Sequence, residues 1–509
     1  IDDIAPADAL HAFVFRSPIA HGVITNLDVI DARESEGVAA VITAADLIAA
    51  GISMDLEGTV GKNRDGTGGA EPPRPLLATD RVRHVGEPVA LIFADTMQQA
   101  RDAAELIEFD YDELPVQLAL APGDIDIHAE APGNLAFDWE MGDAEKTQSE
   151  FDKAAHVVKL EVGDNRVIVN SIEPRGCYAE FDGERLHVAM NAQGVWAHWN
   201  RLSQMLNMPK DNIRVTNPDT GGGFGMKAMA YPEAYVLAHA AMTLGRPVRW
   251  MSDRTEAMLT DNAGRDLVSW AEFAFDANHR IQAYRVHTDC NMGAYNSQFA
   301  QPIQTQLFSR VLMGTYDVQA TYLSVKGYYT NTTQVDAYRG AGRPEAIYVL
   351  ERLMDRAARE LGVDLWELHH KNFIPLEKFP YKTTTGETYD VGDFSRVLNH
   401  AETACDRAGF GARKSASEAN GKLRGQGLCF YIESILGDPS ESTRVEFNDD
   451  GTVCIFVGTQ SNGQGHETVY AKFLSDQTGI PLEKIIVVQG DSDLIKQGGG
   501  TGGSRSVTV

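Results

Sequence analysis

The sequence predicts an α+β chain in which a small α/β domain precedes larger regions of mixed α/β structure. Short apolar strands alternate with an amphipathic helical pattern over residues 1–120. From about residue 155 the pattern changes to longer strands, glycine-rich loops and helices, which continue to the end of the sequence. The apolar periodicity breaks again near residues 411–420. We therefore expect domains at 1–120, 151–400 and 401–509, with a connector at 121–150.

Two strands, a helix and a loop characterise the first predicted domain. Residues 39–42 and 88–93 are apolar and β-branched and have the length of buried strands. Residues 96–107 repeat apolar side chains at helical spacing, which predicts an amphipathic helix. The glycine-rich, polar stretch 61–75 predicts an exposed loop. No residue pattern in this domain indicates chemistry by itself.

Composition excludes several classes of protein. The 509 residues include 45 Lys+Arg and 72 Asp+Glu, which gives a formal net charge of −27. No run of about 18 apolar residues indicates a membrane span. The acidic balance, without any basic block, disfavours nucleic acid as a partner. The five cysteines form no CxxC pair, which favours reduced thiols in a cytoplasmic protein over a disulfide framework or a metal site.

Neither end of the sequence has the features of a natural terminus. The chain begins at Ile1 without Met, and it stops at Val509 directly after a glycine-rich stretch. We therefore expect a fragment that is truncated at both ends, and no signal peptide can be identified in it.

Glycine-rich segments stand before three predicted helices. Residues 221–227 precede a helix that begins at Pro232, and residues 339–343 precede one that begins at Pro344. Residues 463–466 precede a third helix, for which we expect Val469 and Phe473 on the core face. A fourth cluster, residues 498–506, follows near the end.

Glycine lets backbone N–H groups approach a ligand closely, and the positive end of a following helix favours an anion at the same place. Each segment alone is equally compatible with a tight turn. Together they favour a large, polar, phosphate-bearing cofactor. Residues 221–227 lack the Gly-Lys-Ser/Thr ending of a P-loop, and the GxGxxG match at 498–503 follows no convincing strand. An ordinary nucleotide-binding oxidoreductase is therefore disfavoured.

Neutral amides recur near these segments. Amide side chains both donate and accept hydrogen bonds, so they suit oxo groups and the edge of a heterocycle. Surface or turn positions are the alternative explanation for each of them. The candidates are Gln193, Asn331, Gln460, Asn462 and Gln464.

The glycine segments resemble, in their order and neighbours, the molybdenum-binding large subunit of the xanthine dehydrogenase family. The resemblance rests on residues 221–227, on 330–332 with 337–346, and on 463–468. That family includes aldehyde oxidoreductases, N-heteroaromatic hydroxylases and aerobic carbon monoxide dehydrogenases. Residues 1–120 resemble its α/β hammerhead domain. The resemblance implies a hammerhead domain followed by two molybdopterin-binding domains, of which the second is incomplete.

The resemblance also implies a cofactor and partners. The cofactor is molybdopterin, or its cytosine dinucleotide, carrying Mo, and the reaction hydroxylates an electron-poor carbon of a small molecule with water as the oxygen source. Because the chain has no cysteine cluster, the resemblance implies an iron–sulfur subunit with 2Fe-2S centres and an FAD subunit as electron-transfer partners. It further implies a dimer of heterotrimers.

The resemblance assigns roles to individual residues. Gln193 matches a glutamine that hydrogen-bonds an oxo ligand of Mo, and Arg339 matches an arginine at the pterin. The protein is expected to supply no direct ligand to the metal. The remaining cofactor-binding matches are Gly223, Phe224, Gly225, Gly463, Gln464, Gly465, Ser504, Arg505 and Ser506. The predicted substrate pocket contains Tyr338, Gly340 and Ala341.

Three positions depart from particular branches of that family. Ala228 and Ala341 stand where purine-oxidising members have a glutamate and a substrate-stacking phenylalanine. Gly340 stands where carbon monoxide dehydrogenases have a copper-binding cysteine. The sequence therefore disfavours purines and carbon monoxide and predicts oxidation of an aldehyde or an N-heteroaromatic carbon.

No catalytic residue is assigned within this sequence. The family's general base is a glutamate near the C-terminus, which we expect beyond Val509, so we expect the fragment alone to be inactive. Glu233 and Glu345 open predicted helices and are expected to be structural. The alternative is a non-catalytic relative with the same fold that acts as a scaffold or assembly protein. The intact second and third glycine segments argue against it.

Overall fold

The first 115 residues form the small α/β domain that the sequence predicts. The computed structural model describes residues 1–56, 58–437 and 441–506. The predicted strands lie within β3 and β5, and the predicted helix corresponds to the shorter α3. Within the predicted exposed loop, Pro72 and Arg74 are buried. The elements of this domain are β1 (Leu10–Arg16), β2 (Gly22–Asp28), α1 (Ile30–Glu34), β3 (Val38–Thr43), α2 (Ala44–Ala49), β4 (Arg81–Val82), β5 (Pro88–Ala94), α3 (Met97–Ala104) and β6 (Glu108–Glu113).

A seven-stranded sheet joins this domain to the region that follows. Its order is β12-β11-β10-β13-β1-β5-β3, and β1 pairs in parallel with β13 at Leu10 and Val248. The sheet therefore crosses the predicted boundary at residue 120. The added elements are β10 (Gly176–Phe181), β11 (Leu186–Met190), α5 (Trp196–Met205), β12 (Ile213–Thr216), α6 (Pro232–Leu244) and β13 (Val248–Met251). Helix α6 begins at the predicted proline and is almost entirely buried against the sheet.

A second sheet of five strands carries the long helix that follows the second glycine segment. Its order is β7-β17-β16-β15-β8, and the apolar face of helix α10 packs into the same core. Strand β7 and most of helix α4 fall within residues 121–150, which the sequence analysis treats as a connector. The elements are β7 (Leu135–Gly142), α4 (Ala144–Lys153), β8 (His156–Asp164), β15 (Leu267–Phe275), β16 (Ile281–Gly293), β17 (Ala320–Tyr329) and α10 (Arg343–Leu361).

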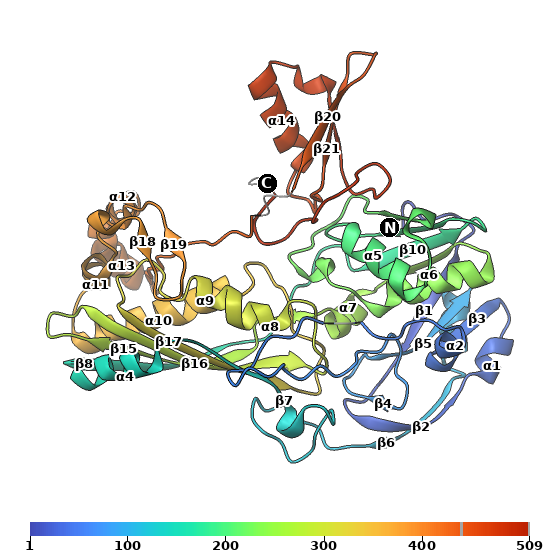
Figure 1. The fold of residues 1–509 in the computed structure, drawn as a ribbon, viewed down its shortest axis with the longest axis horizontal. Coiled ribbons are helices and arrows are strands. Elements are labelled where there is room, and N and C mark those ends of the chain that lie inside the picture. The colour runs from blue at the N-terminus through green and yellow to red at the C-terminus, as the bar shows by residue number, and fades with distance from the viewer. Residues whose placement is uncertain (57, 438–440, 507–509) are drawn as a thin grey trace.

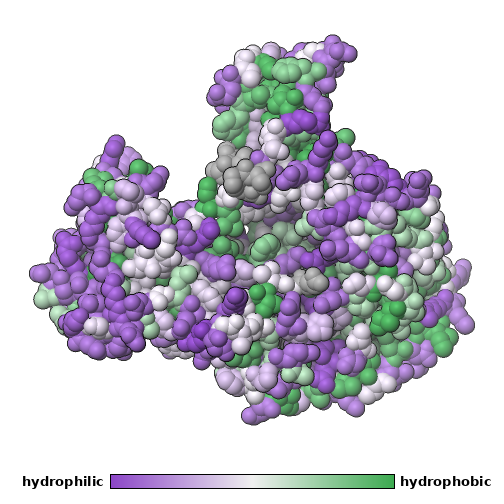
Figure 2. Space-filling view, viewed as in Figure 1, coloured by the Kyte–Doolittle hydropathy of each residue, from purple (hydrophilic) through white to green (hydrophobic). Residues whose placement is uncertain are grey.

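The last part of the chain forms an upper lobe that stands on the rest of the molecule (Figure 1). In this lobe helix α14 (His466–Thr478) packs on a sheet of the order β20-β21-β22. Those strands are β20 (Thr443–Phe447), β21 (Val453–Val457) and β22 (Ile485–Val488). The prediction that Phe473 lies on the core face of this helix is wrong, because Phe473 is 55% exposed. Tyr470 is buried there instead. Figure 2 shows the lobe separated from the helices on the left by a deep gap.

The predicted break at residues 411–420 is a helix, α13 (Phe410–Ala419), with no buried residue. It lies with α11 (Leu365–Asn372) and α12 (Phe394–Ala404) at the left of Figure 1, and an extended segment leads from it to the upper lobe. Among the described residues no helix is long and apolar enough to cross a membrane. The short elements are β9 (Val167–Ile168), α7 (Arg254–Thr260), β14 (Ala263–Gly264), α8 (Ala300–Pro302), α9 (Phe308–Arg310), β18 (Tyr381–Lys382) and β19 (Thr388–Tyr389).

A buried ion network fastens helix α6 to the first domain. Arg175 lies 2.9 Å from Glu233 and 2.6 Å from Asp261, and Arg16 lies 2.7 Å from the other oxygen of Glu233. Burial opposes ionisation of Glu233, but the two arginines outweigh it and lower its pKa to about 2. Glu233 thus has the structural role that the sequence predicts for it.

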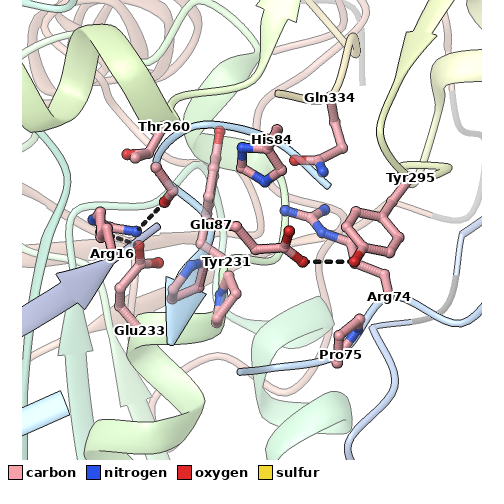
Figure 3. Close-up of a pocket in the computed structure, with 13 residues that line it drawn as sticks. Arg16, Arg74, Pro75, His84, Glu87, Tyr231, Glu233, Thr260, Tyr295 and Gln334 are labelled. Carbon is pink, nitrogen blue, oxygen red and sulfur yellow. Dashed lines mark hydrogen bonds and ion pairs between the residues drawn. The ribbon is translucent and has the colours of Figure 1, made fainter. Parts of the chain in front are cut away.

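Beside this network lies a small polar cavity, shown in Figure 3 with Arg16 next to Glu233 and with Glu87 bonded to Tyr295. Its volume of about 20 Å³ has room for about one water molecule, so it is too small for an organic substrate. The chemistry must therefore lie elsewhere in the molecule.

Replacing Arg175 by Met should strongly destabilise the fold. The change leaves Glu233 and Asp261 buried with too little positive charge, which costs about 3–5 kcal/mol. The control is Arg356→Met, which removes an exposed partner of Glu360 and should cost less than about 0.5 kcal/mol. Urea unfolding measures both, and equal effects would contradict a stabilising role of the network.

The same network predicts an acid dependence of stability. A carboxyl whose pKa is lowered in the folded state stabilises the protein above its unfolded pKa, and this contribution is lost as the pH falls through the folded pKa. For Glu233 the window runs from its ordinary value of 4.5 down to about 2. The free-energy difference between the parent protein and Glu233→Gln should therefore shrink over this range. A difference independent of pH would contradict the ion-pair account.

Candidate functional site

The first glycine segment, residues 221–227, is a loop closed by one carboxylate. Oε2 of Glu173 accepts from the backbone N of Gly221 at 2.7 Å and lies 3.2 Å from Nζ of Lys227, so it joins both ends of the loop. Burial raises the pKa of Glu173, but the hydrogen bond from Gly221 and the charge of Lys227 outweigh this and hold it below its ordinary value. Between these ends Phe224 has a left-handed φ of 54° and a half-exposed ring.

Gln193 contacts this loop from a position three residues after the end of the core strand β11. Its Oε1 accepts from the backbone N of Gly225 at 2.8 Å, and its Nε2 donates to the backbone O of Thr501 at 2.8 Å. A Cβ on Gly223 would lie 2.6 Å from the same Oε1, so glycine is required for this approach. Gln193 thus connects the first glycine segment to the fourth.

The second segment joins the first through its backbone. The N of Arg339 donates to the O of Phe224 at 2.8 Å, and the Arg339 guanidinium lies 5.7 Å from the Phe224 ring centre. Gly340, Ala341 and Gly342 follow with φ of 102°, 46° and 86°. A Cβ on Gly340 would lie 2.1 Å from Cγ of Pro344, so the loop accepts no side chain there without moving.

The third segment presents backbone donors at the start of α14. No side chain caps this helix, and the backbone N groups of Gly463, Gln464 and Gly465 form no hydrogen bond within the described part of the chain. A Cβ at Gly465 would meet nothing within 4 Å, so the space in front is open. Unpaired N–H groups and the positive end of a helix suit an anion.

The third segment also touches the other segments. The O of Asn462 accepts from the N of Gly222 at 3.2 Å, and the N of Gln460 donates to Oγ1 of Thr501 at 3.0 Å. The buried oxygens Oε1 of Gln460 and Oδ1 of Asn462 have no hydrogen-bond partner among the described residues. Both oxygens are therefore enclosed acceptors whose hydrogen-bonding capacity is unused.

The fourth segment contacts the site through a residue that the sequence analysis did not single out. Thr501 bonds to Gln193 through both its N and its O, whereas Ser504, Arg505 and Ser506 form no hydrogen bond with Gln193 in the described structure, although Oγ of Ser506 lies 3.1 Å from Oγ1 of Thr501. Arg505 pairs with Glu441 at 3.0 Å, and the O of Ser506 accepts from Tyr470. Only its glycine-rich neighbourhood could have pointed to Thr501.

One amide candidate, Asn331, and one carboxylate candidate, Glu345, lie outside this cluster. Asn331 bonds to the N of Gln117 and the O of Arg83, so it ties strand β17 to the first domain and does not face the glycine loops. Glu345 is buried in the first turn of α10 and pairs with Arg265 at 2.9 Å. Burial raises the pKa of Glu345 above its ordinary value.

All four glycine-rich segments thus meet in one place, with Gln193, Phe224 and Thr501 at the contacts. No group of three or more His, Cys, Asp or Glu side chains in the described ranges is arranged to hold a metal ion. The arrangement offers backbone donors, neutral amides and the exposed cation of Arg339. It can hold a large polar anion with a heterocycle. The cofactor and substrate roles of the individual residues remain predictions.

Comparison with known proteins supports this interpretation. Residues 1–115 match the a/b hammerhead domain of aldehyde oxidase and xanthine dehydrogenase, and residues 127–373 and 401–509 match two molybdopterin cofactor-binding domains. The chain is 33% identical to the carbon monoxide dehydrogenase large chain of Hydrogenophaga pseudoflava and 31% identical to the nicotine 6-hydroxylase large subunit of Paenarthrobacter nicotinovorans. Both matches cover 100% of this chain, and 66% and 64% of those relatives, so it spans about two thirds of their length.

Solved structures give the same result. A Cu,Mo-CO dehydrogenase in its carbon monoxide reduced state matches with a TM-score of 0.90 and 31% identity, over 100% of this chain and 67% of that one. Quinoline 2-oxidoreductase from Pseudomonas putida 86 matches with a TM-score of 0.91 and 29% identity. This match covers 99% of this chain and 66% of that one. The predicted fold class, a hammerhead domain followed by molybdopterin-binding domains, is confirmed.

Replacing Gly340 by Ala should disturb the second segment through its clash with Pro344. Gly386→Ala is a matched control, because Gly386 has a similar φ of 97° but nothing within 4 Å of a Cβ. In the control, alanine should lower the free energy of unfolding only by the cost of a left-handed backbone conformation, about 1–2 kcal/mol. Gly340→Ala should cost about 1–3 kcal/mol more, as for an overpacked core. Urea unfolding compares them, and equal losses would show that the loop relaxes freely.

Proposed function

This chain belongs to the family of molybdopterin-binding large subunits of xanthine dehydrogenase and aldehyde oxidoreductase, and from that premise we propose that it binds the cofactor and substrate of a molybdenum hydroxylase. The observation that carries the proposal is the meeting of four glycine-rich segments around Gln193. Their links are the bonds from Gly225, Arg339, Gly222 and Thr501 described above.

The groups that the site presents fit molybdopterin. The unpaired N groups of residues 463–465 at the start of α14 suit its phosphates, in the cytosine dinucleotide or the simpler form. The orphaned oxygens of Gln460 and Asn462 suit N–H donors of the pterin. The second hydrogen on Nε2 of Gln193 is free to donate toward an oxo group, and Arg339 stands beside Phe224 at the same opening.

When bound, the cofactor supplies the redox chemistry and activates water. The chain's own residues would then hold the cofactor and orient the substrate. Gln193 would hold the first and fourth glycine segments together, the adjacent Phe224 ring and Arg339 guanidinium would lie beside the bound group, and the loop with Tyr338, Gly340 and Ala341 would border the substrate. The catalytic base is not among the residues that we assign.

The substrate that we propose is an aldehyde or an N-heteroaromatic ring. Relatives named nicotine 6-hydroxylase and aldehyde oxidoreductase support this class, as does the quinoline 2-oxidoreductase fold. Position 340 holds a glycine, which has no thiol to bind copper, so we disfavour copper-dependent oxidation of carbon monoxide. The small Ala341 side chain leaves room for a ring.

We propose that electrons leave this part of the enzyme through partner proteins. The five cysteines are all free, and Cys177 and Cys290 are buried in separate parts of the fold, so they do not form an iron–sulfur site. We propose an iron–sulfur subunit and an FAD subunit as partners, in a cytoplasmic dimer of heterotrimers. The name of one relative, a dehydrogenase complex subunit from Paenarthrobacter nicotinovorans, supports a multisubunit complex.

A scaffold or assembly protein with the same fold is the second candidate. It would have no need for open space in front of unpaired N–H groups at the start of α14, or for orphaned amide oxygens beside them. Unpaired buried polar groups cost stability, so their retention favours a ligand.

Metal and pterin analysis of the purified enzyme tests the proposal. We expect stoichiometric Mo and a released pterin, and active protein without them would reject it. Gln464→Ala should lower cofactor retention by about 10-fold, because Gln464 shapes its loop through Oε1, which accepts from Asn462 N at 2.5 Å. Gln98→Ala, on the exposed face of α3, is the control and should leave the cofactor content unchanged.

A further inference from the structure

Arg265 lies in a strained turn behind the second glycine segment. Gly264 ends β14, and Arg265 and Asp266 both have left-handed φ, at 63° and 69°. Two successive non-glycine residues in this conformation are uncommon and are retained where the surrounding structure requires them. A Cβ on Gly264 would lie 2.3 Å from Cβ of Tyr338, so the turn and the loop touch directly.

The guanidinium of Arg265 reaches two consecutive carbonyl groups of that loop. Its Nη1 donates to the O of Tyr338 at 3.1 Å, and its Nη2 donates to the O of Arg339 at 2.8 Å. It also lies 4.8 Å from the centre of the Tyr338 ring. Hydrogen bonds from a charged donor are the strong ones, and the planar fork of arginine suits two neighbouring acceptors.

The loop requires such a restraint. Gly340, Ala341 and Gly342 follow one another with φ of 102°, 46° and 86°, and such a run is unfavourable for Ala341. On its other side the loop has the bond from Arg339 N to Phe224 O. Without Arg265 the carbonyl of Arg339 would lose its donor, the carbonyl of Tyr338 would keep only the bond from Ala341 N, and the Tyr338 ring would lose its cation.

Glu345 holds Arg265 in turn. Its Oε1 lies 2.9 Å from Nη1, while its Oε2 has no hydrogen-bond partner in the described ranges. Both side chains are nearly inaccessible, at 9% and 1% exposure. Removing Arg265 alone would leave a buried carboxylate uncompensated, so loss of folding must be separated from loss of loop position.

We propose that Arg265 is a positioning residue that fixes the loop of Tyr338, Gly340 and Ala341 and thereby the shape of the substrate pocket. That this loop borders a substrate rests on the proposed function. That Arg265 fixes the loop rests only on the contacts above. It acts through the backbone of residues 338 and 339 and on the Tyr338 ring.

The test compares three variants in the assembled enzyme. Arg265→Lys keeps the charge for Glu345 but cannot bridge two carbonyls. The double variant Arg265→Met with Glu345→Gln removes both charges and so avoids a lone buried carboxylate. Glu345→Gln alone keeps an acceptor for Arg265 and is the matched control. Hydrogen exchange of a peptide covering residues 337–342, Mo and pterin content, KM and kcat are measured for each.

For Arg265→Lys and the double variant we expect exchange of this peptide to accelerate about 10-fold or more, the effect of one lost charge-assisted hydrogen bond. KM should rise by about 10-fold while kcat changes less. Glu345→Gln keeps the two bonds from Arg265 to the loop carbonyls, so its exchange at residues 337–342 and its KM should change less than those of either Arg265 variant. Unchanged exchange of residues 337–342 in both Arg265 variants overturns the proposal, and so does a faster exchange that leaves KM unchanged.

The outcomes also separate this inference from the proposed function. A parent enzyme without Mo and pterin refutes the proposed function, while the hydrogen-exchange result still decides whether Arg265 fixes the loop. A general loss of structure would accelerate exchange over the whole chain. Selective acceleration at residues 337–342, with the peptide of α3, residues 97–104, as internal reference, is therefore required.

Discussion

The side-chain amide of Gln193 is the contact on which the rest of the site depends. An amide is a donor at one end and an acceptor at the other, so one neutral side chain satisfies the N of Gly225 and the O of Thr501 together. The two partners belong to different lobes of the molecule. Gln193 itself is buried three residues after the end of the core strand β11, close to the sheet that anchors this part of the chain. The position of the upper lobe is therefore coupled to the shape of the first glycine loop.

Strain in one loop is balanced by contacts from another. Phe224 and Ala341 have left-handed φ, which costs about 1–2 kcal/mol at each non-glycine residue. The bond from Arg339 N to Phe224 O joins the two strained loops, and Gly222 bonds to Asn462 in the third. No loop keeps its conformation by its own sequence alone. The site is a property of the assembled domains.

This explains which parts of the molecule could be predicted from the sequence. The helices after the glycine segments follow from local signals, such as Pro232 at the start of α6 and Gly362 after the end of α10. The loss of apolar periodicity near residues 411–420 coincides with helix α13, because a helix exposed on all sides has no apolar face. The pairing of β1 with β13 and the contacts of Thr501 are long-range and have no local signature. Arg265 was missed for the same reason.

The net charge of −27 raises the question of how an acidic chain can attract an anionic cofactor. The nearby cations are mostly neutralised, since Lys227 pairs with Glu173, Arg343 with Glu433 and Arg505 with Glu441. The attraction must then come from oriented backbone N–H groups and from the positive ends of α10 and α14. These act within the first turn, and at physiological salt distant surface charges are screened beyond about 8 Å. Local backbone geometry therefore decides whether the anion is held, and the acidity of the surface has little influence on it.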